Sequence, residues 1–189
     1  MSLFASVRVP VGGVLRLLRG DRGGLAAIGA HTRAGWIASF LVPGMLALPA
    51  YLYLSLPDLD ASDAPARMLL LEALAYVVGL ALFPVAVHPL CEQWGKTRAW
   101  YDYVPAYNWA GLLQMAIYLP AAMLSQSDAI DGVPLFLVGI AAVTAAVAIQ
   151  FRVAMVVLGI DRFRALSLVA LELALGAVLR QIVDRLQGL

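Results

Sequence analysis

Five long apolar stretches, separated by short polar connections, constrain the fold of this chain more than any other feature. They cover Ala34–Leu56, Met68–Leu90, Val104–Ser125, Pro134–Leu158 and Leu166–Gln187. A helix that crosses a membrane needs about 20 predominantly apolar residues, because about 30 Å of hydrocarbon is crossed at about 1.5 Å per residue. None of the stretches alternates between polar and apolar residues, as membrane β-strands do. The pattern therefore predicts an all-α, polytopic membrane helix bundle with five transmembrane helices.

The composition excludes other classes of protein. Hydrophobic residues make up 62% of the chain and charged residues 13%, whereas a soluble domain has about 45–50% and about 25%. A soluble enzyme and a disordered chain are both excluded by these values. The net charge of +1 gives no attraction to nucleic acid, and the single cysteine, Cys91, excludes an intramolecular disulfide. We expect the lipid bilayer as one partner, and a membrane-protein partner or a second copy of this chain as another.

The positions of arginine and lysine predict the orientation. Positive residues lie before the first span and in the second and fourth connections, at Arg8, Arg16, Arg19, Arg22, Arg33, Lys96, Arg98, Arg162 and Arg164. The first and third connections carry Asp58, Asp60, Asp63, Asp128 and Asp131, with Arg67 as their one positive residue. Because cytoplasmic connections carry the excess of positive residues, we expect a cytoplasmic N-terminus and an external C-terminus.

The chain divides into an N-terminal segment, residues 1–33, and a five-helix transmembrane domain, residues 34–189. The N-terminal segment is basic, and Leu15, Leu17 and Leu18 interleave with its arginines. Two interpretations stay open. The segment is either a short amphipathic helix on the cytoplasmic leaflet, or a flexible basic tail, because its glycines disfavour a helix.

Aromatic residues gather near the predicted cytoplasmic ends of the spans. They are Trp36, Trp94, Trp100, Tyr101, Tyr103, Tyr107 and Trp109. Indole and phenol rings favour the headgroup level, because one end of each ring is apolar and the other is polar. We interpret these residues as interfacial anchors rather than as a platform that binds a lipid or a partner.

Polar residues inside the spans are the candidate functional residues. An ionisable group near the bilayer centre costs about 2.5–3.5 kcal/mol on insertion scales, so each one needs a partner or a purpose. Arg152 and Glu172 lie at similar depth on neighbouring antiparallel spans, and we expect them to pair. Glu72 and Arg180 form a second candidate pair in the external half. The predicted buried polar cluster contains Arg152, Glu172, Asn108, Gln114, Gln150 and His88.

No catalytic motif is present. His31 and His88 have no metal-ligand spacing, and the chain has no HExxH, no GxSxG and no glycine-rich phosphate loop. Cys91 has only His88 as a nearby histidine, three residues earlier, which we interpret as an incidental neighbour. We therefore expect no enzymatic activity, no cofactor and no metal.

Several short stretches carry a resemblance to known proteins. They are Arg16-Leu17-Leu18-Arg19-Gly20-Asp21, Gly35-Trp36, Ser39-Phe40, Phe83-Pro84 and Ala106-Tyr107-Asn108-Trp109. With five spans and the orientation above, the chain resembles the Yip-type family and a set of proteobacterial inner-membrane proteins of unassigned function. The Asp-Leu-Tyr-Gly-Pro motif of eukaryotic Yip proteins is absent, which argues against a role with small GTPases in vesicle traffic. The resemblance transfers no functional residue.

Two functions compete on these grounds. The paired charges and small residues favour a non-enzymatic scaffold, or a subunit of a larger assembly, in a bacterial inner membrane. Twelve arginines against one lysine fit a GC-rich bacterial gene. The alternative is a small transporter or channel that uses the polar interior around Glu172, Arg152, Gln114 and Asn108. A third possibility is a lipid sensor that acts through the basic N-terminal segment.

Overall fold

The computed structural model describes residues 3–55, 64–127 and 130–187, and these residues form helices and connections only. Two shorter helices come first, α1 (Leu3–Leu18) and α2 (Gly24–Ile28). Five long helices follow: α3 (Arg33–Leu54), α5 (Pro65–Gln93), α6 (Thr97–Ser125), α7 (Gly132–Leu158) and α8 (Arg162–Gln187). The prediction of an all-α fold is confirmed for this part of the chain. Leu56, Asp58, Asp60, Asp63 and Asp128 lie outside it.

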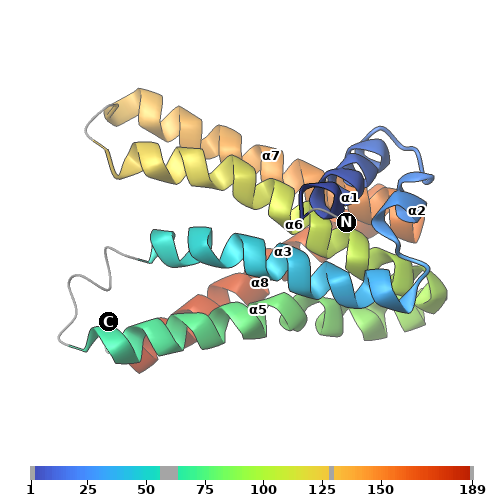
Figure 1. Cartoon of the computed structure of the whole chain (residues 1–189), viewed down its shortest axis with the longest axis horizontal. Coiled ribbons are helices and arrows are strands. Elements are labelled where there is room, and N and C mark those ends of the chain that lie inside the picture. The colour runs from blue at the N-terminus through green and yellow to red at the C-terminus, as the bar shows by residue number, and fades with distance from the viewer. Residues whose placement is uncertain (1–2, 56–63, 128–129, 188–189) are drawn as a thin grey trace.

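The long helices run along the long axis of the molecule and form a splayed bundle (Figure 1). α6 packs against α7 and α3, and α5 packs against α8. At the end where α1 and α2 lie, all five long helices come together, whereas the α6–α7 pair diverges from α3, α5 and α8 at the other end (Figure 1). We call these the α1 end and the open end.

The main hydrophobic core lies at the α1 end. Its members come from α1, α2, α5, α6, α7 and α8, and the fully buried ones include Val14, Leu17, Val87, Val153 and Leu168. α1 contributes to this core through Val14 and Leu17, which are both 0% exposed. Arg16, in α1, and Arg19, directly after its last residue, are both exposed.

Two glycines allow α1 and α2 to touch. A Cβ atom on Gly13 would lie 2.7 Å from the carbonyl oxygen of Gly24, and one on Gly24 would collide with the carbonyl oxygen of Gly13. The glycines that argued against a helix therefore permit close packing between two helices. Gly20, with φ +89°, makes the turn that follows α1.

Short connections join the long helices. Gly159 follows the last residue of α7, and its φ of 60° is the left-handed conformation typical of a helix C-terminus. Asp161 then accepts a hydrogen bond from the backbone N–H of Arg164 at 3.0 Å, which caps the first turn of α8. Thr32 caps α3 in the same way, by accepting from the N–H of Gly35 at 3.0 Å.

Four of the long helices, α3, α5, α7 and α8, are long and apolar enough to cross a membrane. Their exposed residues include many large apolar side chains, such as Met45, Val77, Phe136 and Leu173. Such a surface is typical of helices that face lipid. The described residues thus indicate a multi-pass helical membrane protein.

α6 does not reach the same hydropathy, so the prediction of five spans is not confirmed. Polar and aromatic residues, among them Tyr107, Asn108 and Gln114, lower its average. α6 also begins at Thr97, seven residues before the predicted span at Val104, because the helix continues beyond its apolar part. The other helices end within four residues of the predicted spans.

A candidate polar site inside the helix bundle

Two clusters of polar side chains lie inside the long helices. The Glu172 cluster consists of Tyr107, Gln114, Gln150 and Glu172, from α6, α7 and α8. The Glu72 cluster consists of Tyr51, Glu72, Arg180, Asp184 and Gln187, from α3, α5 and α8. Both lie in or beside candidate membrane spans, where water is scarce and each polar group requires an internal partner.

The Glu172 carboxylate receives hydrogen bonds from neutral donors. The hydroxyl of Tyr107 donates to Oε1 at 3.0 Å, and the amide of Gln150 donates to the same oxygen at 3.4 Å. The Gln150 amide also lies 3.3 Å from Oε1 of Gln114, whose own amide donates to the carbonyl of Ala146 at 2.8 Å. Gln150 is 2% exposed. Within the described residues, no ion pair to Glu172 occurs.

The predicted pairing of Arg152 with Glu172 is wrong. The guanidinium of Arg152 donates instead to the carbonyl of Leu18 at 3.1 Å, and the residue is exposed. The depth of the two residues was compatible with a pair, but Gln150 occupies the face of α7 that meets Glu172. Arg152 therefore satisfies the C-terminal end of α1, where a cation is favourable.

The Glu72 cluster does contain an ion pair. Glu72 is 1% exposed, and its Oε1 accepts from Arg180 at 3.0 Å and from the amide of Gln187 at 2.9 Å. Its Oε2 accepts from the hydroxyl of Tyr51 at 2.8 Å. Nε of Arg180 lies 2.8 Å from Asp184, one helical turn further along α8. The structure thus brings together the second pair that the sequence suggested, and adds Tyr51 and Gln187.

Asn108 and His88 lie outside the Glu172 cluster. Asn108 is 6% exposed and donates to the hydroxyl of Ser39 at 3.2 Å. His88 packs edge-on against Trp100, with ring centroids 4.7 Å apart, and its Nδ1 is 3.8 Å from Glu92. The six residues predicted as one cluster therefore separate, and Gln114, Gln150 and Glu172 stay together.

Two adjoining cavities lie between the clusters. A cavity of about 360 Å³ at the open end is lined by residues that include Tyr51, Arg180, Tyr76 and Gly79. A second cavity of about 130 Å³ is lined by Tyr76 and Gly79 again and by Tyr107. Both volumes exceed the space that one water molecule needs. The shared lining residues place the cavities next to each other, between the partners of Glu72 and the tyrosine that binds Glu172.

Three of the predicted interfacial aromatics have other surroundings. Tyr103 and Trp109 are 1% and 2% exposed and belong to the main core, because α1 and α2 cover α6 there. Tyr107 binds Glu172. Tyr101, in contrast, is 54% exposed, and Trp36, Trp94 and Trp100 are partly exposed.

Tyr107 is the member of the Glu172 cluster that we interpreted as an interfacial anchor. Its position in the sequence contained a second signal, since Tyr107, Gly111, Gln114 and Tyr118 follow one another at helical spacing on one sector of α6. That sector faces the interior, whereas proximity to other aromatic residues suggested the interface. Among the described residues, no group of three or more His, Cys, Asp or Glu side chains is suited to hold a metal ion.

Comparison with known proteins adds no family. No protein-family model matches the chain. No curated protein and no solved structure matches it either. The resemblance to the Yip-type family therefore stays a prediction.

Proposed function

We propose that the chain crosses a bacterial inner membrane five times. In this proposal α6 is a span in addition to α3, α5, α7 and α8. Two features support this. α6 has 29 residues, as many as α5, and it packs between α3 and α7, which both qualify as spans. A helix shielded by neighbouring spans does not need the hydropathy of a lipid-facing one. Five antiparallel crossings also place α1 and the end of α8 at opposite ends of the bundle (Figure 1).

Single cysteines test this topology in a variant whose native thiol is replaced by Cys91→Ala. Cysteines at Arg22 and at Asp131 are labelled with a membrane-impermeant maleimide in intact cells and in inverted vesicles. We expect the cysteine at position 131 to react only from outside the cell and the cysteine at position 22 only from the cytoplasmic side. Labelling of both positions from the same side of the membrane would overturn the five-span proposal.

The further proposal is that the protein is a small transporter or channel that passes a proton or a small cation through Glu172. The observation that carries it is the environment of this carboxylate, to which the described residues offer only neutral hydrogen-bond donors. Glu172 lies ten residues into α8, about 15 Å along its axis. An intramembrane carboxylate without a counter-charge is typical of ion and proton pathways. The pairing of Glu172 with Arg152, which favoured a scaffold in the sequence analysis, does not occur among the described residues.

The adjoining cavities are the proposed route of the ion toward Glu172. They extend from the open end, beside Arg180, to Tyr107. Tyr107 lines the second cavity and its hydroxyl donates to Glu172, so this one residue contacts both the cavity and the carboxylate. Tyr107 is therefore the candidate relay, and Glu172 the candidate binding group.

Proteoliposomes test the function directly. The purified protein is reconstituted with a pH-sensitive dye inside, and proton entry is followed after an inward pH gradient and a K⁺-valinomycin potential are applied. We expect Glu172→Gln to abolish the flux and Tyr107→Phe to slow it. Glu92→Gln, which changes an exposed carboxylate on α5, is the matched control and keeps it. A series in which Na⁺ or K⁺ replaces the proton gradient distinguishes the ions. Wild-type flux equal to that of empty liposomes for all three ions would overturn the proposal.

The scaffold is the second candidate, and the Glu72 cluster favours it. That cluster ties α3, α5 and α8 together with one ion pair and two further hydrogen bonds to Glu72. Membrane proteins use such buried polar contacts to fix helix packing. The proposed scaffold catalyses no reaction and belongs with the Yip-type proteins. Co-purification of one defined membrane protein in mild detergent, without ion flux, would support it.

A further inference from the structure

A separate cavity lies at the α1 end and shares no lining residue with either polar cluster. Its volume is about 530 Å³, and its wall is formed by the connection between α2 and α3, the first turn of α3 and the first turns of α6. The lining residues are Ala30, His31, Thr32, Arg33, Trp36, Arg98, Tyr101 and Asp102. Neither the sequence motifs nor the proposed transport function uses this cavity.

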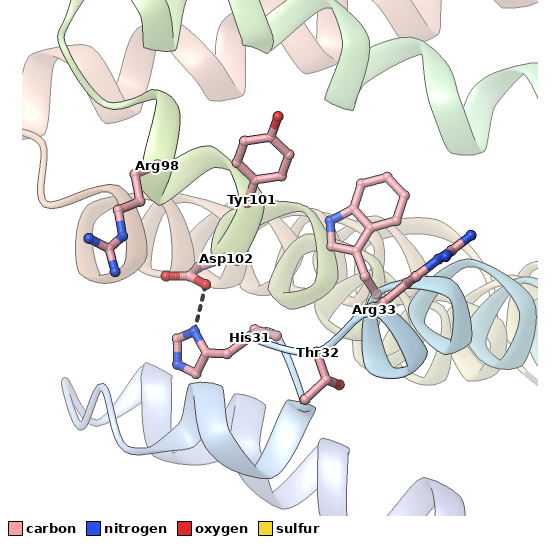
Figure 2. Close-up of a pocket in the computed structure, with 8 residues that line it drawn as sticks. His31, Thr32, Arg33, Arg98, Tyr101 and Asp102 are labelled. Atoms are coloured by element: carbon pink, nitrogen blue, oxygen red, sulfur yellow. Dashed lines mark ion pairs between the residues drawn. The ribbon is translucent and has the colours of Figure 1, made fainter.

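The wall of the cavity carries two arginines, Arg33 and Arg98, and one carboxylate, Asp102. Figure 2 shows Arg98 and Asp102 on α6 facing His31, with Nδ1 of His31 2.9 Å from Oδ1 of Asp102. Arg33 lies on the far side of the cavity from Arg98 (Figure 2). Arginine stays charged at all physiological pH values, so two arginines outweigh the single carboxylate. In the ranges that the structure covers, neither guanidinium has an ion-pair partner.

A further feature favours an anion here. The first turn of α3, a helix of 22 residues, borders the cavity and presents the positive end of the helix dipole.

The location indicates the source of the anion. The cavity lies at one end of the long helices, where α3 and α6 begin, and its aromatic residues Trp36 and Tyr101 are of the kinds enriched at the headgroup level. Tyr101 is 54% exposed and Arg98 is exposed, so the site is open to the surrounding bilayer surface. A phosphate carried by a lipid reaches this depth without leaving the membrane.

We infer that the cavity binds the phosphate of an anionic phospholipid, with Arg98 and His31 on one side and Arg33 on the other. Trp36 and Tyr101 then contact the glycerol and the upper acyl chains of the same lipid. Asp102 orients His31 and limits the net positive charge of the site. The inference is independent of Glu172, because the two sites share no residue.

The number of retained lipids tests the proposal. The protein is extracted from nanodiscs that contain equal amounts of phosphatidylglycerol and phosphatidylcholine, and bound lipids are counted by native mass spectrometry. We expect the wild type to retain phosphatidylglycerol preferentially. Arg98→Gln and Arg33→Gln should each lower its retention about fivefold, because one basic residue near an anionic surface contributes about 1 kcal/mol. Asp102→Asn should raise retention, a change that loss of folding does not produce.

Arg164→Gln is the matched control, since Arg164 is a half-exposed arginine that pairs with Asp161 at the beginning of α8 and lies outside the cavity. It should retain phosphatidylglycerol like the wild type. An equal loss in Arg164→Gln and Arg98→Gln, or equal retention of the two lipids by the wild type, would overturn the inference. A separate titration with inorganic phosphate distinguishes the sources. If phosphate alone displaces the lipid at millimolar concentration, the site is one for soluble phosphate and the lipid assignment is wrong.

Discussion

Gln150 donates a hydrogen bond to the carboxylate of Glu172 over 3.4 Å, in the place where the sequence suggested Arg152. Each residue of an α-helix is turned by about 100° from the one before, so positions 150 and 152 differ by about 200°. Matching depth on two antiparallel helices is therefore compatible with either residue, and the rotation of α7 decides between them. As a result, the carboxylate of Glu172 faces the amide of Gln150, and Arg152 binds the carbonyl of Leu18 at the end of α1.

This arrangement predicts that Arg152 and Glu172 contribute independently to stability. Arg152→Ala and Glu172→Gln share no partner, so their effects on the free energy of unfolding should add within about 0.5 kcal/mol in the double variant. Unfolding by denaturant in detergent micelles measures the three variants. Glu72→Gln with Arg180→Gln is the comparison, and there we expect a coupling of about 1 kcal/mol or more. A comparable coupling between Arg152 and Glu172 would restore the ion pair.

The hydroxyl of Tyr51 is expected to stabilise the bundle through Glu72. Tyr51→Phe removes a 2.8 Å hydrogen bond to a carboxylate that is 1% exposed. Loss of a hydrogen bond to a buried charged group costs about 1.5–3 kcal/mol. Tyr53→Phe is the control two residues away on the same helix, and should change the free energy of unfolding by less than about 0.5 kcal/mol. Equal effects of the two substitutions would contradict the role of Tyr51.

Neighbouring glycines on α1 should respond differently to alanine. A Cβ on Gly13 would lie 2.7 Å from the carbonyl oxygen of Gly24 and 2.9 Å from Ile28, whereas one on Gly12 meets nothing within 4 Å. Gly13→Ala should therefore destabilise the docking of α1 on α2 by about 1–3 kcal/mol. Gly12→Ala should be neutral or stabilising, because alanine favours a helix. Limited proteolysis between α1 and α2 reports the difference, and equal cleavage of both variants would argue against this contact.

The sequence was sufficient to predict the five long helices, because each of them contains a long apolar stretch. The boundaries of α3, α7 and α8 follow from where those runs end. α1 was harder to predict, since Gly12 and Gly13 argued against a helix when read by intrinsic propensity alone. The contact between Gly13 and Gly24 that compensates for this joins two different helices, and such a contact leaves no local pattern.

The polar site was predictable only in part. Residue type and depth singled out Glu72, Arg180 and Glu172, because an ionisable residue inside a span is conspicuous. Their partners depend on helix rotation and on which helix covers which face, as Gln150 and Tyr107 illustrate. The cavity around His31 and Arg98 was invisible, because it joins residues about 70 positions apart on either side of two spans.

The turn between α1 and α2 should be sensitive to acid through Asp21. Nε of Arg16 donates to its carboxylate at 2.7 Å, and the backbone N–H of Gly23 donates at 2.8 Å. These hydrogen bonds lower the pKa of Asp21 below its ordinary value of 3.8, with the one from Arg16 as the largest cause. Since the folded-state pKa is the lower one, the carboxylate stabilises the turn above pH 3.8, and this contribution disappears as the pH falls through the folded-state pKa. Protection of the Gly23 amide from hydrogen exchange in detergent, corrected for the intrinsic rate, should therefore decrease as the pH falls below 3.8.

Asp21→Asn should show low protection of this amide already at pH 6 and no further decrease in acid. Asp161→Asn, in the turn before α8, is the control because the hydrogen bond from the Arg164 N–H likewise lowers the pKa of Asp161. This control should leave the protection of the Gly23 amide and its decrease in acid unchanged. If the decrease in acid persists in Asp21→Asn, another group is responsible for the acid sensitivity of this turn.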